Sequence, residues 1–265
     1  MVKIQLLANH GAVRFLMPRR KRQKPISKDE IDVLAVRLFK VFLRGSKKDL
    51  VCYLPPGNRY TGGRIAGPEN QWNSDRDRRR DSELCNQIWK QTGCTVGACF
   101  YDVYSSPLDK NGVRRPHNWI GSVYDFAKKA KYERLHLVGY SGGAMLASSQ
   151  LVFHPSRPKR QDPIVRTLVL IAGDVAARRD VPHRNAAYVA DKIEARTLLI
   201  WGTKDDPAKR GAQVWTEHNP RAKERHYDGG HNFYDDGQFG NVTGMVVDWL
   251  TKEPAIKQMA KRKAP

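Results

Sequence analysis

The fold of this chain is decided by the stretch Leu135-His136-Leu137-Val138-Gly139-Tyr140-Ser141-Gly142-Gly143. The stretch begins as a short run typical of a buried parallel strand, and its last five residues fit the pattern Gly-x-Ser-x-Gly. In this pattern the turn is so tight that the serine backbone is strained, and the flanking glycines let strand and helix approach each other. The residues from Gly142 to Phe153 are mostly apolar and predict a helix. Ser141 is therefore expected at the tip of a strand-to-helix turn, with its hydroxyl clear of the sheet.

A serine nucleophile needs a base and an acid that orients the base, and both residue types follow Ser141. The apolar run Arg196–Trp201 ends at a turn that contains Asp205, the expected acid. The run Lys223–Tyr227 leads into a glycine-rich turn that ends at His231, the expected base. The glycines free the backbone, so that the imidazole can reach back across the carboxyl edge of the sheet.

Each candidate also has a purely structural interpretation. Ser141 could be a small residue in a tight turn, Asp205 could cap a helix beside Asp206, and His231 could be a turn residue near Asp228. Asp206 is the nearest alternative acid, and Asp174, which follows the preceding predicted strand, is a second. The order of serine, acid and histidine behind three separate strands favours the catalytic interpretation.

In the segments Gly139–Gly143, Gly202–Asp205 and Gly230–Phe233 the chain resembles the α/β-hydrolase family, and the resemblance extends from about residue 41 to residue 250. It implies an α/β fold with a mostly parallel, eight-stranded sheet, helices on both faces and a Ser-His-Asp triad. It does not imply a substrate, because the family includes esterases, thioesterases, lipases, peptidases, lyases and proteins without activity.

The family forms part of its oxyanion hole in the loop after the third strand. Here the run Leu50–Leu54 ends in Pro55-Pro56-Gly57-Asn58. The resemblance therefore implies main-chain N–H donors from Asn58 (or Arg59) and from Gly142, the residue after the serine. The family more often has His-Gly in this loop, so Pro56-Gly57 departs from its pattern.

Strand and helix patterns alternate along the rest of the chain, as in a parallel α/β sheet. Leu38–Leu43 and Leu50–Leu54 predict an early hairpin or neighbouring strands. Further strands are predicted at Thr95–Tyr101 and Arg166–Ala172, and helices at Asp81–Gln91, from Pro116 to Ala130 and from Phe239 to Leu250.

Two irregular polar segments, Gly57–Arg80 and Ser105–Arg115, are expected to flank the mouth of the active site and to select the substrate. Only 22 residues separate Gly173 from Arg196, so we expect a minimal cap domain or none.

Cysteine and histidine spacing gives no sign of a metal. The cysteines are Cys52, Cys85, Cys94 and Cys99; they form no C-x-x-C pair, so we expect reduced, mostly buried thiols. The histidines other than His231 are scattered without metal-site spacing. We therefore expect no metal and no cofactor.

Positive charge gathers at the two ends of the chain. Residues 1–28 carry eight Lys or Arg and no acid, residues 251–265 carry five against Glu253, and together they hold 12 of the net charge of +20. We expect a basic N-terminal arm over 1–28, a hydrolase domain over 29–250 and a basic tail over 251–265. Such arms bind nucleic acid or ribonucleoprotein by counterion release, although solvated tails are the simpler interpretation.

The sequence therefore predicts an enzyme that cleaves a small-molecule carboxylic ester or thioester through a Ser-His-Asp triad and an acyl-enzyme. The alternative is a hydrolase fold retained as a structural or binding subunit of a nucleic-acid or ribonucleoprotein assembly. We find no apolar stretch long enough for a membrane span and no secretory signal. We expect an intracellular protein, either cytoplasmic or organellar, and the acid-poor, Arg-rich start leaves mitochondrial import open.

Overall fold

The computed structural model describes residues 4–6, 13–15, 38–43, 45–56, 75–100, 119–153, 164–176 and 186–252. Their helices and strands are β1 (Ile4–Leu6), β2 (Val13–Phe15), β3 (Leu38–Leu43), β4 (Ser46–Leu54), α1 (Asp75–Thr92), β5 (Cys94–Phe100), α2 (Trp119–Lys129), β6 (Arg134–Tyr140), α3 (Gly142–Phe153), β7 (Ile164–Ile171), the 3-10 helix η3 (Ala186–Lys192), β8 (Arg196–Gly202), α4 (Asp206–His218), β9 (Lys223–Tyr227) and α5 (Phe239–Thr251).

The strands form one sheet in the order β1-β2-β3-β5-β4-β6-β7-β8-β9. The six strands from β5 to β9 in this order run parallel, and β1, β2 and β3 add an antiparallel edge. The predicted fold class, an α/β fold with a mostly parallel sheet, is confirmed. The described part of the sheet has nine strands rather than eight, and β1 and β2 are its outermost strands on the antiparallel side. Both lie in residues 1–28, and the predicted division of the chain at residue 28 stays a prediction.

The prediction that Leu38–Leu43 and Leu50–Leu54 are a hairpin or neighbouring strands is wrong, because β5 lies between β3 and β4. The chain crosses over the start of β5, where a Cβ on Gly45 would lie only 2.2 Å from the carbonyl oxygen of Gly93. Glycine at position 45 permits this close approach. The polar residues from Ser46 onward, which suggested a hairpin turn, are the beginning of β4.

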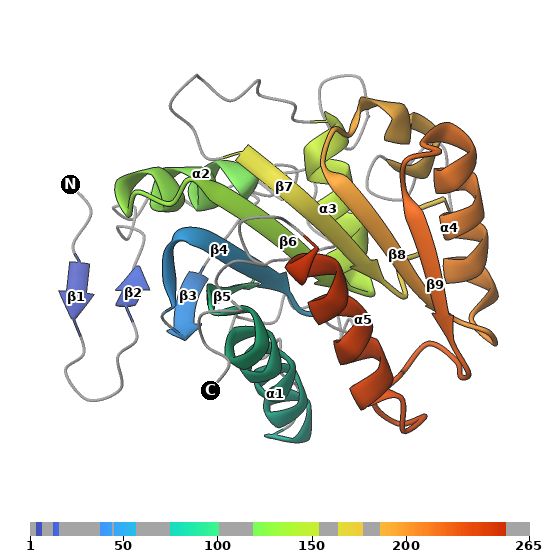
Figure 1. Ribbon diagram of the computed structural model, residues 1–265, viewed down its shortest axis with the longest axis horizontal. Helices are drawn as coiled ribbons and strands as arrows, with labels where there is room; N and C mark the ends of the chain where they lie inside the picture. The colour runs from blue at the N-terminus through green and yellow to red at the C-terminus, as the bar shows by residue number, and fades with distance from the viewer. Residues whose placement is uncertain are drawn as a thin grey trace, which may run out of the picture.

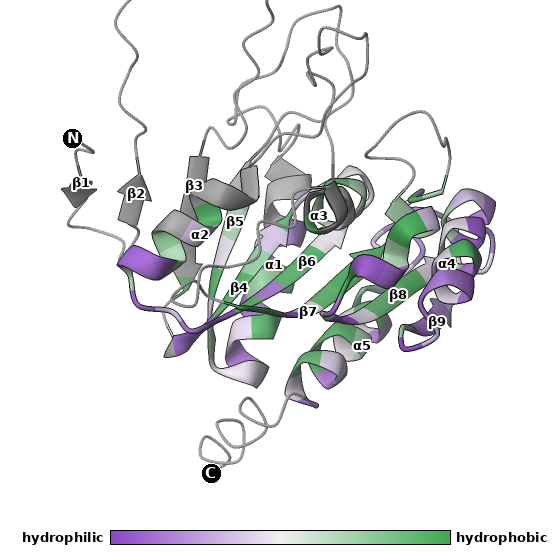
Figure 2. Ribbon diagram, turned by 90° about the horizontal axis from the view of Figure 1, so that it is seen from above, coloured by the Kyte–Doolittle hydropathy of each residue, from purple (hydrophilic) through white to green (hydrophobic). Residues whose placement is uncertain are grey.

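Two helical layers cover the sheet (Figure 1). Buried residues of α1 and α5 pack on one face, and buried residues of α2, α3, α4 and η3 pack on the other. Successive residues of β4 point to opposite faces, so that Leu50 and Cys52 join one core cluster and Val51 and Tyr53 the other. In Figure 2 the hydrophobic residues follow β4, β6, β7 and β8. The predicted helices on both faces are therefore present.

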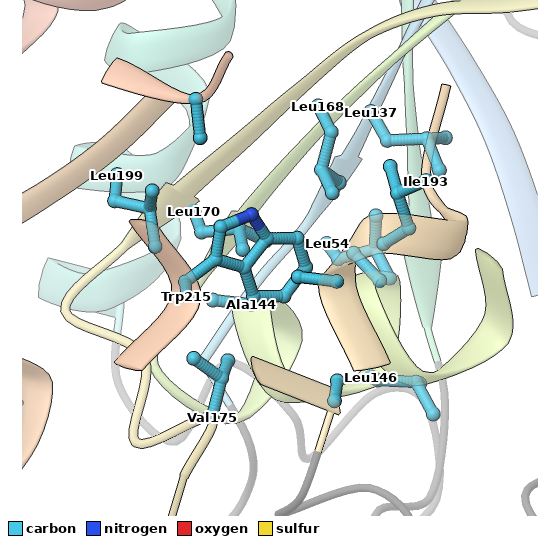
Figure 3. Close-up of a cluster of buried hydrophobic side chains, with 14 of the residues drawn as sticks. Leu54, Leu137, Ala144, Leu146, Leu168, Leu170, Val175, Ile193, Leu199 and Trp215 are labelled. Carbon is cyan, nitrogen blue, oxygen red and sulfur yellow. The ribbon is translucent and has the colours of Figure 1, made fainter. Parts of the chain in front are cut away.

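Trp215 anchors α4 to the sheet (Figure 3). Its fully buried indole lies among the apolar side chains of β4, β6, β7, β8, α3 and η3. A buried tryptophan removes about 150–250 Å² from water, so this contact holds α4 firmly against the strands. Because α4 begins at Asp206, the packing of Trp215 also fixes the turn that carries Asp205.

The described residues include parts of two of the predicted loops. Residues 75–80, the described end of the segment predicted as irregular, are the first turns of α1. Between β7 and β8 the described residues 172–176 and 186–195 contain one short 3-10 helix and no cap domain. The predicted polar loop Ser105–Arg115 lies outside the described residues.

Candidate active site

Ser141 lies in the turn between β6 and α3. Its φ of 54° is in the left-handed region, which a non-glycine residue rarely adopts. A Cβ on Gly139 would lie 2.5 Å from the carbonyl oxygen of Gly143, and a Cβ on Gly143 would lie 2.2 Å from that of Leu54. The Ser141 N–H donates to the carbonyl oxygen of Ile171, 2.8 Å away, which ties the turn to β7. The two glycines thus permit the turn that exposes Ser141.

Asp205 follows β8 and is the N-cap of α4. Its Oδ1 accepts a hydrogen bond from the N–H of Ala208, and the residue is only 5% exposed. The positive end of the α4 dipole therefore faces the carboxylate. The helix-capping interpretation of Asp205 is correct, and it leaves the second carboxylate oxygen, Oδ2, available for another partner.

His231 lies in the loop between β9 and α5. A Cβ on Gly202 would lie 2.3 Å from the carbonyl oxygen of Gly230, so glycine at 202 lets this loop lie against the turn that carries Asp205. The Gly230 N–H donates to Oδ2 of Asp236, 2.6 Å away, which closes the loop on itself. The imidazole is 52% exposed, so solvent and small molecules reach it.

The three side chains form one hydrogen-bonded row. His231 Nδ1 lies 2.8 Å from Asp205 Oδ2, and His231 Nε2 lies 2.8 Å from Ser141 Oγ. An ionised carboxylate only accepts hydrogen bonds, so Nδ1 carries the ring proton. Nε2 of the neutral ring is then the acceptor for the serine hydroxyl. Residues from three loops at the carboxyl edge of the sheet are brought together in this way.

The two alternative acids lie elsewhere. Asp206 is the first residue of α4 and is exposed to solvent. Asp174 follows β7, and its Oδ1 lies 3.7 Å from a guanidinium nitrogen of Arg210 on α4. Among the contacts of the described residues, Asp205 is the carboxylate that meets the imidazole of His231.

Gly142 begins α3, so its N–H belongs to the first helical turn, whose N–H groups have no acceptor within the helix. The next residue, Gly143, touches the main chain of Leu54 and Pro55, where the loop after β4 begins. This loop therefore starts in contact with the turn of Ser141. The predicted second donor, Asn58 (or Arg59), lies outside the described residues.

Sequence reasoning missed an aromatic group beside the imidazole. The Tyr140 hydroxyl donates to the main-chain carbonyl oxygen of His231 at 3.2 Å, and the two rings stack with centroids 6.0 Å apart. Phe233 packs edge-on against Tyr140 at 5.0 Å and stacks on Tyr234 at 4.1 Å. Burial raises the pKa of Tyr140 well above its usual value, so the phenol keeps its proton and donates. The available signal was their position in the sequence, directly before Ser141 for Tyr140 and within three residues after His231 for the other two.

The described residues include no group of three or more His, Cys, Asp or Glu side chains that could hold a metal ion. The predicted lack of a metal and of a cofactor stays a prediction. Cys52, Cys85 and Cys94 are buried and lie in no disulfide, as expected, and the side chain of Cys99 lies outside the described part. A helix long and apolar enough to cross a bilayer is absent from the described ranges.

Solved structures with the same fold include several esterases. An esterase from the hyperthermophilic archaeon Pyrobaculum calidifontis is 14% identical, with a TM-score of 0.58 over 88% of this chain and 85% of its own. A predicted CIB-like hydrolase from Thermoplasma acidophilum is 16% identical, with a TM-score of 0.55 over 95% and 99%. The thioesterase domain from the curacin biosynthetic pathway is 14% identical, with a TM-score of 0.50 over 79% and 95%. At these identities the likeness shows the fold alone.

Fold and sequence together define a serine hydrolase of the α/β-hydrolase class. The model of the family described as serine hydrolase (FSH1) matches residues 71–234, more than half of the chain, and the match includes Ser141, Asp205 and His231. The chain belongs to this FSH1 serine hydrolase family. The comparison with curated proteins gave no match.

Proposed function

We propose that this enzyme hydrolyses a small-molecule carboxylic ester or thioester through a covalent acyl-enzyme on Ser141. The observation that carries the proposal is the continuous row from Ser141 Oγ through His231 to Asp205, with 2.8 Å at each step. Nucleophile and base within hydrogen-bonding reach, and a third group that orients the base, are the geometric requirements of this chemistry.

In the first half of the reaction, Ser141 Oγ attacks the carbonyl carbon of the substrate while His231 Nε2 takes the hydroxyl proton. Asp205 holds the ring through Nδ1 and stabilises the imidazolium that forms. The imidazolium then gives the proton to the departing alcohol or thiol, and the acyl group remains bonded to Oγ. The bond to the leaving group breaks as the tetrahedral intermediate collapses.

The negative charge on the tetrahedral oxygen needs donors that are already in place. We assign the main-chain N–H of Gly142 to this role, because it lies at the start of α3, where N–H groups and the helix dipole favour an anion. The second donor is assigned to Asn58 (or Arg59), whose loop begins in contact with Gly143. Removing one such donor costs about 10² to 10³ in rate.

Water completes the reaction by the same route in reverse order. The imidazole of His231 is half exposed, so water can approach Nε2 once the leaving group has gone. His231 takes a proton from that water as it attacks the acyl carbon, and the proton then returns to Ser141 Oγ. The products are a carboxylic acid and the free enzyme.

Labelling with a fluorophosphonate tests this proposal. We expect one label per chain, on the peptide that contains Ser141, and no label in Ser141→Ala. That variant should fold normally and lose about 10⁴-fold or more in kcat on p-nitrophenyl acetate, because the attacking atom is gone. Ser148→Ala is the matched control: its hydroxyl lies buried in α3, the helix that follows Ser141, and donates to the Met145 carbonyl oxygen, so labelling should persist.

An unlabelled wild-type protein, or full activity in Ser141→Ala, would refute the proposed function. If the unlabelled full chain also sedimented with RNA, the result would favour the alternative of a binding subunit in a nucleic-acid assembly. The salt dependence of RNA binding would then measure how much the basic ends contribute to the affinity, since each neutralised phosphate adds roughly 0.7 to 0.9 to the magnitude of the slope of log K against log salt.

A further inference from the structure

A buried carboxylate on α1 connects strand β4 with the loop that carries His231. Asp81 is 2% exposed, and its Oδ1 accepts hydrogen bonds from the hydroxyls of Tyr53 at 2.7 Å and Tyr234 at 2.9 Å. Burying a carboxylate is costly unless such donors surround it, so this arrangement tolerates little displacement of either phenol. Neither the sequence pattern nor the proposed chemistry accounts for Asp81.

The two tyrosines are held very differently by their own main chains. Tyr53 lies within β4, where the strand pairs with β5 on one side and β6 on the other, so its backbone stays in place without its hydroxyl. Tyr234 lies three residues after His231, in a loop without sheet pairing. Its main-chain N–H donates to the side chain of Asn232 within the same loop. Its contact with Asp81 therefore ties this loop to α1.

Both phenols remain donors across the accessible pH range. Burial, with the charge of Asp81 adding to it, raises the pKa of Tyr234 well above its usual value, and the same two causes raise the pKa of Tyr53. The hydrogen bonds to Asp81 are thus not lost as pH rises through neutrality.

Neighbouring contacts converge on the same part of the loop. Arg80, the residue before Asp81, forms an ion pair with Asp235, and its guanidinium lies 5.3 Å from the centre of the Tyr234 ring. The Tyr234 ring also packs against Tyr140 at 6.0 Å, and Tyr140 bonds the carbonyl oxygen of His231. The second half of the His231 loop is therefore fixed from α1, whereas Gly230 is fixed separately by Asp236 and by the hydroxyl of Tyr227.

We propose that Asp81 is a positioning residue: acting through the Tyr234 hydroxyl, it sets where the His231 imidazole lies relative to Ser141 Oγ. The proposal rests on the proposed function for its kinetic consequence alone. A displaced base loses rate even when substrate binding is unchanged, and a misplacement of about 1 Å costs on the order of 10²-fold.

Two matched variants distinguish an effect on the position of the His231 imidazole from an effect on the stability of the fold. Tyr234→Phe and Tyr53→Phe each remove one phenolic donor to the same oxygen of Asp81, so their unfolding midpoints in urea should fall by similar amounts. We expect Tyr234→Phe to lower kcat on p-nitrophenyl acetate about tenfold with KM within about twofold of wild type. Tyr53→Phe should keep kcat within about twofold.

The second readout needs no turnover. The proton between His231 Nδ1 and Asp205 should give a far-downfield proton NMR signal, assigned by its loss in His231→Gln. We expect this signal to shift or broaden in Tyr234→Phe and to remain in Tyr53→Phe.

An unchanged signal and unchanged kcat in Tyr234→Phe would overturn the proposal, as would equal kcat losses in the two variants. If the wild type hydrolysed nothing but the signal responded as expected, the proposed function would fail and the positioning role of Asp81 would stand.

Discussion

Replacing Asp205 by asparagine separates its two roles, because one oxygen caps α4 and the other meets His231. The helix offers only a donor, the Ala208 N–H, so the asparagine oxygen must face it. The amide nitrogen then faces Nδ1 of His231. The imidazole can adapt to this donor by moving its proton to Nε2, whereas the helix N-terminus cannot adapt.

The expected result is a large loss of activity with little loss of stability. A ring protonated at Nε2 cannot take the proton of Ser141, and we expect kcat to fall on the order of 10⁴-fold, equivalent to about 5.4 kcal/mol. Asparagine is as good an N-cap as aspartate, so the free energy of unfolding for Asp205→Asn should change by less than about 1 kcal/mol.

Initial rates on p-nitrophenyl acetate and urea unfolding measure the two quantities. Asp206→Asn is the matched control, because it removes an exposed carboxylate one residue further along and touches neither partner of Asp205. It should keep kcat within about twofold and lose less than about 1 kcal/mol of stability. If Asp205→Asn retained more than a tenth of wild-type kcat, or Asp206→Asn fell equally far, the assignment of the acid would be wrong.

Two further predictions concern stability. Gly143→Ala should lower the free energy of unfolding by about 3 kcal/mol or more and remove most activity, because the added Cβ would lie 2.2 Å from the Leu54 carbonyl oxygen. Gly244→Ala, on the exposed side of α5, should raise the free energy of unfolding by about 0.5–1 kcal/mol. Urea unfolding measures both, and a Gly143→Ala variant as stable as the wild type would contradict the close contact. Asp49→Asn should lose about 3 kcal/mol at pH 7, because it breaks the ion pair between this fully buried carboxylate and the partly buried Arg134. Burial alone would raise the pKa of Asp49, but the hydrogen bonds from Arg134 and from the neighbouring imidazole of His136 outweigh it and hold this pKa well below its usual value. The ionised carboxylate therefore stabilises the fold above about pH 4. Below that pH this stabilisation is progressively lost, so the difference in free energy of unfolding between wild type and Asp49→Asn should narrow in unfolding experiments at lower pH.

Local signals in the sequence were sufficient for the parts of the site that one turn defines. The turn around Ser141 needs small residues at 139 and 143, and these glycines were visible in the sequence. The strand before Asp205 was visible as an apolar run, because a parallel strand inside the sheet is buried on both faces, whereas β9, the strand before His231, is a short polar run at the edge of the sheet. Their order along the chain then predicted which side chains meet at the carboxyl edge.

Contacts between distant segments were not visible in the sequence. The placement of β5 between β3 and β4 depends on strand pairing, and the short polar link between the two apolar runs fits a hairpin equally well. Asp81 was predicted on a helix, where a carboxylate is usually solvated, and only the tertiary fold brings Tyr53 and Tyr234 to it. Helix α4 was foreseen only through the possible cap at Asp205, because its sequence is rich in charged residues and its apolar face is narrow.

A hydroxyl, an imidazole and a carboxylate occur in a row twice among the described residues, and position distinguishes the two rows. His136 lies between Thr167 Oγ1 at 2.8 Å and Asp49 Oδ1 at 3.2 Å, yet its side chain is fully buried at the amino end of β6. Thr167 is fully buried within β7, so no substrate carbonyl can approach its hydroxyl there. Ser141 is likewise in a row with an imidazole and a carboxylate. It lies, however, in a strained turn at the carboxyl edge, beside Gly142 at the start of α3 and the half-exposed imidazole of His231. The bonds alone therefore do not distinguish the two rows, whereas exposure and the helix start beside Ser141 single it out as the candidate nucleophile.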